Sequence, residues 1–323
     1  MKLLVTGGAG NIGAVMTRQL VSNGHEVVVY DSLDNGHRES VDSKATLEVG
    51  DLGDREKLKQ IFSSHQFEGV FHFAGAISMA ESMQNPEKYF RTNTFYTLNL
   101  LNLMKEYKTP YFIFSSTAGV YGNPTKIPIP ESHSKNPTNP YGESKYMVEK
   151  ILSWYDTIFG IKSICLRYFN ASGATRDGLL GERHKDESHI IPLAIESILA
   201  GKPFTIFGKD YKTPDGTCVR DYIHIEDLCS AHLLGLKALV DGSSSTQYNV
   251  GTGKGYSNKQ IVDKIEEVSG NKLNVSYGDR RPGDADELVA DSTRIRKELG
   301  WIPQYSDLDT IVKTAWDFHK NHQ

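Results

Sequence analysis

Apolar runs of strand length alternate with longer segments of helical pattern through the first half of the chain. The runs cover residues 3–6, 27–31, 69–74, 111–115 and 163–168. They are continuous apolar runs rather than alternations of apolar and polar residues, which is typical of strands buried on both faces of a parallel sheet. The pattern therefore predicts an α/β fold with a doubly wound parallel sheet of the Rossmann type.

The pattern changes after Asn170. Residues 171–187 are rich in Gly, Asp, Arg and other polar residues, and a helical pattern follows over residues 190–200. Shorter elements come next, separated by turn sequences such as Asp215-Gly216 rather than by a long linker. We interpret this part of the chain as a smaller α/β lobe that packs closely on the first.

The length of 323 residues exceeds what one compact core usually needs. We predict an N-terminal Rossmann domain over residues 1–170, joined by parts of residues 222–250. A C-terminal domain is expected to consist mainly of residues 171–323.

Composition and charge narrow the class of protein. Hydrophobic residues make up 38% and charged residues 24% of the chain, and the net charge is -4, so no basic field favours nucleic acid. The first apolar run is too short for a membrane span or a signal peptide, so we expect a cytoplasmic protein without a membrane partner. Cys165, Cys218 and Cys229 form no C-x-x-C pair, which indicates buried thiols rather than disulfides, and we predict no metal site.

A glycine-rich segment, Thr6 to Gly13, lies between the first strand and a helical pattern that runs from Ile12 to about Leu20. This is the context of a dinucleotide-binding loop, in which glycines such as Gly7, Gly10 and Gly13 allow a tight turn and a close approach to a pyrophosphate. A plain tight turn is the alternative.

Acidic residues at the strand ends refine the choice of cofactor. Asp31 closes the second run, where a carboxylate can accept hydrogen bonds from the adenine ribose, which favours NAD. The alternatives are that Asp31 only caps a loop and that nearby Arg38 favours NADP. Asp51 is a second candidate, although many aspartates at strand ends only form turns.

Two Tyr-x-x-x-Lys pairs follow Pro140, and both fall on one predicted helix. The stripe of Tyr141 and Lys145 continues into apolar residues, whereas the stripe of Tyr146, Glu149 and Lys150 is polar and is expected to face solvent. We therefore expect Tyr141, rather than Tyr146, to face the cofactor.

Tyr141 is the candidate acid/base. A phenol has a pKa of about 10, so a nearby Lys145 and a positive nicotinamide are expected to lower the pKa of Tyr141. Thr117, at the carboxyl end of the run over residues 111–115, could orient a reacting hydroxyl beside Tyr141. The alternative is that hydroxyls of Ser115, Ser116 or Thr117 satisfy backbone groups at the strand end.

Along nearly its whole length the sequence resembles the extended short-chain dehydrogenases/reductases, and among them the UDP-glucose (UDP-galactose) 4-epimerases. The segments that carry the resemblance are Val5 to Gly13, His72-Phe73-Ala74-Gly75, Phe114 to Thr117, Val120-Tyr121-Gly122, Pro140 to Lys145, Leu166 to Asn170, Val219 to His224 and Arg280-Arg281-Pro282-Gly283-Asp284.

The resemblance implies a role for each matching residue. It implies that Thr117, Tyr141 and Lys145 are catalytic. The implied NAD-binding residues are Gly7, Gly10, Asn11, Ile12, Gly13, Asp31, Asn35, Asp51, Leu52, Phe73, Ala74, Tyr141, Lys145 and Tyr168. The implied UDP-sugar-binding residues are Thr117, Tyr141, Asn170, His189, Arg220, Arg281, Asp284 and Leu288.

The implied reaction is reversible NAD-dependent epimerisation at C4 of a UDP-hexose, UDP-glucose or UDP-galactose, through a 4-keto sugar. Residues 1–170 would then bind NAD and residues 171–323 the UDP-sugar, and a homodimer would form from the helices around residues 87–108 and after Pro140. Leu288 aligns with a position that limits the size of the sugar pocket, so acceptance of N-acetylated sugars stays open.

Three other functions are considered as alternatives. A 4,6-dehydratase needs an acidic pair just after the catalytic threonine, and Ala118-Gly119 cannot supply it. An epimerase or decarboxylase of UDP-uronic acids, UDP-pentoses or UDP-N-acetylhexosamines is the enzymatic alternative. A non-catalytic NAD-binding regulator is the alternative of another class, because a fold does not guarantee chemistry.

Overall fold

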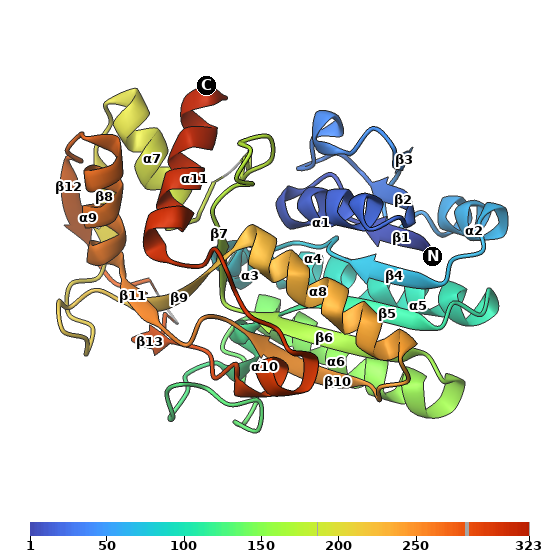
Figure 1. Cartoon of the computed structure of the whole chain (residues 1–323). Coiled ribbons are helices and arrows are strands. Elements are labelled where there is room, and N and C mark those ends of the chain that lie inside the picture. The colour runs from blue at the N-terminus through green and yellow to red at the C-terminus, as the bar shows by residue number, and fades with distance from the viewer. Residues whose placement is uncertain (186, 282–283, 323) are drawn as a thin grey trace. The chain divides into compact units, whose positions relative to one another are not determined.

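The computed structural model describes residues 1–185, 187–281 and 284–322 (Figure 1). Pro282 and Gly283 of the Arg-Arg-Pro-Gly-Asp motif therefore lie outside the described residues. The chain forms two compact units, and each is described by itself. The first unit contains Met1–Gly122, Lys135–Arg167 and Cys229–Tyr248, and the second contains Asn123–Ser134, Tyr168–Leu228 and Asn249–Gln323.

A seven-stranded sheet forms the centre of the first unit, in the order β10-β6-β5-β4-β1-β2-β3. The strands are β1 (Lys2–Thr6), β2 (Glu26–Asp31), β3 (Thr46–Val49), β4 (Gly69–His72), β5 (Tyr111–Thr117), β6 (Lys162–Tyr168) and β10 (Thr246–Val250). Within this order, the neighbouring strands β5, β4, β1, β2 and β3 all pair in parallel. This order, which reverses direction at β1, confirms the predicted doubly wound α/β fold.

Continuous burial explains the continuous apolar runs. Leu3, Leu4 and Val5 of β1 are fully buried, and so are the valines of β2 and Phe112 to Phe114 of β5. A strand covered by helices on both faces cannot alternate apolar and polar residues. All five runs that the sequence analysis assigned to strands are strands, and β3 is a further one.

The helices of the first unit include the site-bearing helix α6, whose ends follow from its sequence. Asn139 accepts a hydrogen bond from Gly142 N at 2.8 Å, Pro140 occupies the first turn, and Gly160 ends the helix in the left-handed region at φ 72°. The helices are α1 (Asn11–Ser22), α2 (Arg55–Ser64), α3 (Met79–Gln84), α4 (Pro86–Tyr89), α5 (Tyr96–Glu106), α6 (Pro140–Phe159) and α8 (Ile225–Val240), which begins in the second unit.

The helix expected over residues 87–108 is not continuous. A π-helical segment, η2 (Phe90–Phe95), separates α4 from α5. Two short 3₁₀ helices, η1 (Arg38–Ser40) and η3 (Ala118–Tyr121), also occur. Interruptions of this kind are frequent at functional sites, and η2 contains the buried Asn93.

The second unit is built on two small sheets. In the larger one, β9 (Val219–His224) pairs with β7 (Asn170–Ser172), β11 (Gly255–Ser257) and β13 (Glu287–Leu288). In the other, β8 (Phe204–Phe207) pairs in parallel with β12 (Val275–Gly278).

The second unit also has its own apolar core. Buried residues of α7, α9 and α11 form it together with residues of β8 and β9. The helices are α7 (Ile190–Ala200), which confirms the helix predicted there, α9 (Asn258–Ser269), α10 (Thr293–Leu299) and α11 (Leu308–Asn321). None of the helices in the described part of the chain is long and apolar enough to span a membrane.

Candidate active site

The glycine-rich loop follows β1 and leads into α1. Gly7 has a φ of 72°, and a Cβ there would lie 2.5 Å from Ala74 N, while a Cβ on Gly13 would overlap Gly7 O. Both positions therefore require glycine, because the loop lies against the segment after β4 and against the start of its own helix.

The start of α1 is suited to bind an anion. Its N-cap is Gly10, so no side chain caps the helix, and Asn11 Oδ1 is buried without a hydrogen-bond partner. The free N–H groups and the helix dipole favour a pyrophosphate at this point. The residues present thus fit the dinucleotide that the sequence predicts.

Asp31 has the loop-capping role considered as its alternative, and it also holds the glycine-rich loop. Its carboxylate accepts hydrogen bonds from Ala9 N and Leu33 N, both at 2.9 Å, so it fixes the glycine-rich loop to the end of β2. A carboxylate has further lone pairs for a ribose hydroxyl. Asp51 accepts a hydrogen bond from Gly53 N at 2.7 Å, which is the turn-forming role considered as its alternative.

The remaining residues of the predicted NAD set lie near the same sheet edge or on the loops that follow it. Leu52 is buried, Phe73 and Ala74 are partly buried after β4, Asn35 is exposed, and Tyr168 is the last residue of β6.

The predicted catalytic residues lie at the end of β5 and on the first two turns of α6. Tyr141 is hydrogen-bonded to the Thr117 side chain, and Thr117 Oγ1 also accepts a hydrogen bond from Gly119 N at 3.0 Å. Lys145 is 2% exposed, and its Nζ donates to Ser115 O at 3.1 Å. The fold thus brings the Thr117 and Tyr141 hydroxyls together. It holds the Lys145 ammonium at the carbonyl oxygen of Ser115, two residues before Thr117 on β5.

The expected effect of Lys145 on Tyr141 is not found in the protein's own side chains. Burial raises the pKa of Tyr141, and only the hydrogen bond with Thr117 opposes this rise. Burial also lowers the pKa of Lys145 to about 8. Lys145 Nζ is held at Ser115 O, and burial outweighs its effect on Tyr141. The lowered pKa that Lys145 and a cationic nicotinamide would produce together stays a prediction.

The polar stripe of α6 does not face solvent throughout, which corrects a second expectation. Glu149 is buried and forms an ion pair with Arg167 of β6, with Arg167 Nε 2.9 Å from Glu149 Oε1 and Arg167 Nη2 2.5 Å from Glu149 Oε2. Ser116 Oγ donates to Glu149 Oε1 at 2.6 Å, and Arg167 Nη1 donates to Tyr121 Oη at 2.9 Å. Ser116 is therefore one of the strand-end hydroxyls with a structural role.

The sequence analysis missed Asn93. Its side chain accepts a hydrogen bond from Ala76 N at 2.8 Å and donates to Ala76 O and to Ser144 Oγ at 3.0 and 3.1 Å. A Cβ at Gly75 would lie 2.7 Å from Asn93 Oδ1 and 3.7 Å from Lys145 Nζ, so this network lies beside the buried lysine. An asparagine inside a helical pattern was the only signal in the sequence.

In the second unit, Arg220 and Asp284 form an ion pair. Arg220 Nη2 also donates to Ala285 O at 2.9 Å, and Tyr211 Oη donates to Asp284 Oδ2 at 3.1 Å. Leu288 lies opposite Arg220 in the parallel pairing of β13 with β9. Three of the predicted substrate residues are therefore brought together, with the guanidinium and carboxylate neutralising each other.

The other predicted substrate residues of this unit lie on separate elements. Asn170 starts β7 and pairs in register with Tyr222 of β9. Arg281 lies over the Phe207 ring, 4.5 Å from its centroid. His189 precedes α7, and its Nδ1 lies 2.5 Å from Glu182 Oε1.

Comparison with known proteins places the chain in a family. A sequence model described as "NAD dependent epimerase/dehydratase family" matches residues 3–251. The chain belongs to this family, and the resemblance that its sequence carries is confirmed.

The similar proteins are UDP-sugar epimerases. A UDP-glucose 4-epimerase of Lactobacillus helveticus is 46% identical over 323 residues, which is 100% of this chain and 98% of that protein. The structure of UDP-glucose 4-epimerase from Brucella ovis in complex with NAD is 40% identical, with a TM-score of 0.94, and covers 98% of this chain and 97% of its own. The UDP-Glc/GlcNAc 4-epimerase from Campylobacter jejuni is 39% identical, with a TM-score of 0.86, and covers 99% of both chains.

Proposed function

We propose that this protein catalyses the reversible NAD-dependent epimerisation of a UDP-hexose at C4, with UDP-glucose and UDP-galactose as the substrate pair. The observation that carries the proposal is the group of Thr117, Tyr141 and the buried Lys145 at the carboxyl end of β5, in the same unit as a glycine-rich loop that fits a dinucleotide. The relatives named above support it.

NAD supplies a hydride acceptor and donor for C4 when it is bound. Tyr141 removes the proton of the 4-hydroxyl as the 4-keto sugar forms, and returns it in the second half of the reaction. Thr117, already hydrogen-bonded to Tyr141, orients the same hydroxyl. Lys145 adds a fixed cation close to the end of β5, in a buried place where its field is little screened.

The UDP-sugar would be held by the second unit, in our proposal, and NAD by the first. Arg220 and Arg281 suit a pyrophosphate, because a guanidinium is planar and permanently charged. Asn170, His189, Asp284 and Leu288 complete the proposed set. An anchored nucleotide would allow the 4-keto sugar to turn while it stays bound.

A second candidate substrate is the N-acetylated pair, and the relative from Campylobacter jejuni, which is named for both kinds of sugar, favours it. Leu288 is intermediate in size between residues that exclude and residues that admit an N-acetyl group. A dehydratase is disfavoured, because the two residues after Thr117 are the buried Ala118 and Gly119, whose N–H donates to Thr117 Oγ1, and neither has an acidic or basic side chain.

The test is an assay of the purified protein without added NAD. UDP-galactose and UDP-N-acetylgalactosamine are supplied separately, and the 4-epimers are separated by chromatography. Conversion of UDP-galactose supports the proposal, and conversion of both sugars supports the second candidate. If neither sugar is converted after NAD is supplied, the proposal is wrong. UDP-uronic acids and UDP-pentoses are then assayed as substrates, and a non-catalytic NAD-binding role is tested.

We further propose a homodimer formed through α5 and α6. The two helices are joined by a hydrogen bond from Tyr155 Oη to Asn102 Oδ1 at 2.7 Å. Large apolar side chains on α6 and at the end of η2 are exposed: Phe95, Trp154 at 64%, Ile158 and Phe159. A gathering of this kind favours a protein interface, and a second copy of the same helices would cover it.

Sedimentation velocity tests the dimer. The double change Trp154→Glu and Ile158→Glu is expected to give a monomer, while Ile302→Glu, at an equally exposed apolar residue of the second unit, should leave the dimer intact. A wild-type protein that sediments as a monomer would refute the proposal. We also propose a cytoplasmic location, which the three buried cysteines, none of them in a disulfide, support. Recovery of the native protein in the membrane or extracellular fraction would contradict it.

A further inference from the structure

Four side chains converge in the loop before α7, and only His189 among them belongs to the proposed UDP-sugar set. The four are Glu182, His184, Glu187 and His189, and one ligand atom from each lies within 4.8 Å of every other. The group uses His189 Nδ1, so a metal there would leave His189 Nε2 for the sugar. Within residues 1–185, 187–281 and 284–322 this is the only such group of three or more His, Cys, Asp or Glu side chains. The sequence analysis predicted no metal site, because it considered the cysteines.

Two of the separations between ligand atoms match those of a tetrahedral site. Zinc bonds of about 2.0–2.1 Å to nitrogen and oxygen place neighbouring ligand atoms about 3.3–3.4 Å apart. His184 Nδ1 lies 3.2 Å from Glu182 Oε1 and 3.4 Å from Glu187 Oε2, and the four ligand atoms all lie within 4.8 Å of one another. The pair of His189 Nδ1 and Glu182 Oε1, at 2.5 Å, has to open by about 0.8 Å to reach that geometry.

Glu187 provides an independent sign of a ligand. Its side chain is 5% exposed, and its Oε1 accepts hydrogen bonds from Ser188 N and His189 N at 2.7 and 2.8 Å. Its Oε2 is buried, and no group in the described part of the chain meets hydrogen-bond geometry with it; His184 Nδ1 lies 3.4 Å away. A buried carboxylate oxygen without a hydrogen bond is costly unless a cation satisfies it.

The two histidines point to a metal rather than to ion pairs alone. Both Nδ1 atoms approach the same oxygen, Glu182 Oε1, and the two rings are 5.8 Å apart. Ion pairing would require two imidazolium cations at this distance. A divalent cation instead takes a lone pair from each neutral Nδ1 and neutralises both carboxylates.

We propose that Glu182, His184, Glu187 and His189 bind one Zn²⁺ ion per chain. Four protein ligands leave no open position, so the site is structural. The described residues from 181 to 189 form neither helix nor strand, and His189 is the N-cap of α7. The ion would therefore fix this loop to the start of α7.

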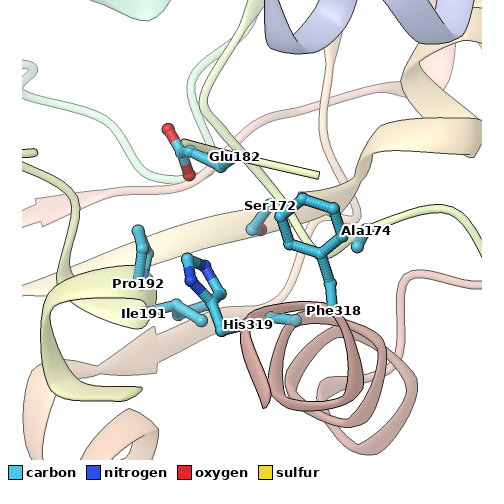
Figure 2. A pocket seen from close by; sticks show the side chains of 9 residues that line it. Ser172, Ala174, Glu182, Ile191, Pro192, Phe318 and His319 are labelled. Atoms are coloured by element: carbon cyan, nitrogen blue, oxygen red, sulfur yellow. The ribbon is translucent and has the colours of Figure 1, made fainter. Parts of the chain in front are cut away.

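The surroundings allow the ion to enter. The His189 side chain is 46% exposed, and Glu182 also lines a small pocket between α7 and α11. Figure 2 shows Glu182 among the side chains that line this pocket, across from Pro192 of α7 and His319 of α11.

The test is the zinc content of tag-free protein, by inductively coupled plasma mass spectrometry after equilibrium dialysis against Zn²⁺. Wild-type protein should bind one equivalent, and Co²⁺ should give the visible absorption of a tetrahedral site. His184→Ala should weaken zinc affinity at least tenfold. His133→Ala, which removes a partly buried histidine outside the group, should not.

Glu187→Gln keeps the test decisive if His184→Ala fails to fold. The glutamine oxygen can still accept the hydrogen bonds of Ser188 N and His189 N, but its NH₂ group replaces Oε2 and cannot bind a metal. A folded variant with at least tenfold weaker zinc affinity supports the proposal. Absence of stoichiometric zinc in the wild type, or equal affinity in wild type and Glu187→Gln, would overturn it whatever the epimerase assay shows.

Discussion

Helix α6 carries the spacing Tyr-x-x-x-Lys twice, and the two pairs lie in different surroundings. Lys145 is buried and bonded to Ser115 O, and Tyr141 is hydrogen-bonded to Thr117. Lys150 is exposed, lies over the Tyr146 ring at 4.4 Å from its centroid, and is 4.0 Å from Glu143 Oε1. A shift of five residues turns a side chain by about 140° around a helix, which is enough to move it from the sheet to the surface.

The difference shows that spacing alone does not define a catalytic pair. An ammonium at the surface is screened by water and makes weak contacts, whereas a buried one acts through a low dielectric. The first pair also adjoins the strand end where ligands of open α/β sheets bind. The predictions below compare substitutions in these two surroundings by their effects on kcat and on the free energy of unfolding.

The largest effect is expected from Tyr141→Phe. The change removes the phenolic proton carrier but keeps the ring, so kcat should fall by about 10²–10⁴-fold. The measurement is the rate of UDP-galactose conversion, with circular dichroism to show that the variant is folded. An unchanged rate would mean that Tyr141 is not the acid/base and would favour a non-catalytic protein.

The buried ion pair of α6 should dominate stability. Glu149→Gln leaves the Arg167 guanidinium without its counter-charge, and the free energy of unfolding should fall by about 3–5 kcal/mol. Urea denaturation measures it. Glu143→Gln on the same helix, where the carboxylate is 4.0 Å from Lys150 near the surface, should change the free energy by no more than about 0.5 kcal/mol. Equal losses of unfolding free energy in Glu149→Gln and Glu143→Gln would show that the buried ion pair stabilises the protein no more than the surface one.

The pH dependence of stability should report on Lys145. Its pKa is lowered from 10.5 to about 8 by burial, so between these values the unfolded chain binds more protons than the folded one. Lys145 therefore makes the free energy of unfolding rise with pH across this window, by about 3 kcal/mol. Below pH 8 it makes no contribution to the pH dependence. The measurement compares nucleotide-free wild type with Lys145→Met, which should lack the rise; an identical pH dependence would show that Lys145 is not held in a desolvated place.

Sequence pattern was sufficient where burial is decided locally. The strands of the Rossmann sheet, the start of α6 at Pro140 and the helix α7 follow from continuous apolar runs, helix caps and periodicity. The glycine positions follow from the turn that they form. These features depend on neighbours within a few residues along the chain.

Pattern was insufficient where a partner lies far along the chain. The sequence pattern predicts Glu149 to be a surface residue, because it does not show that the fold brings Arg167 of β6 beside it. Residues 123–134 belong to the second unit, because Ile129 bridges to Ala290 and accepts a hydrogen bond from Asn249 Nδ2 at 2.8 Å. The pairing of Arg220 with Asp284 is equally distant in sequence. No periodicity encodes such contacts.

The smallest effect is expected from the second pair of α6, which serves as the control for the first. Lys150→Met removes a surface cation–π contact and a weak ion pair, so the free energy of unfolding should change by no more than about 0.5 kcal/mol. Tyr146→Phe should leave kcat within about twofold of wild type, since position 146 is turned by about 140° around the helix from Tyr141, the tyrosine that contacts Thr117. Both variants are measured in the epimerase assay and by urea denaturation beside Tyr141→Phe. A loss of rate in Tyr146→Phe comparable to that in Tyr141→Phe would mean that the contact with Thr117 and the burial of Lys145 do not decide which tyrosine transfers the proton.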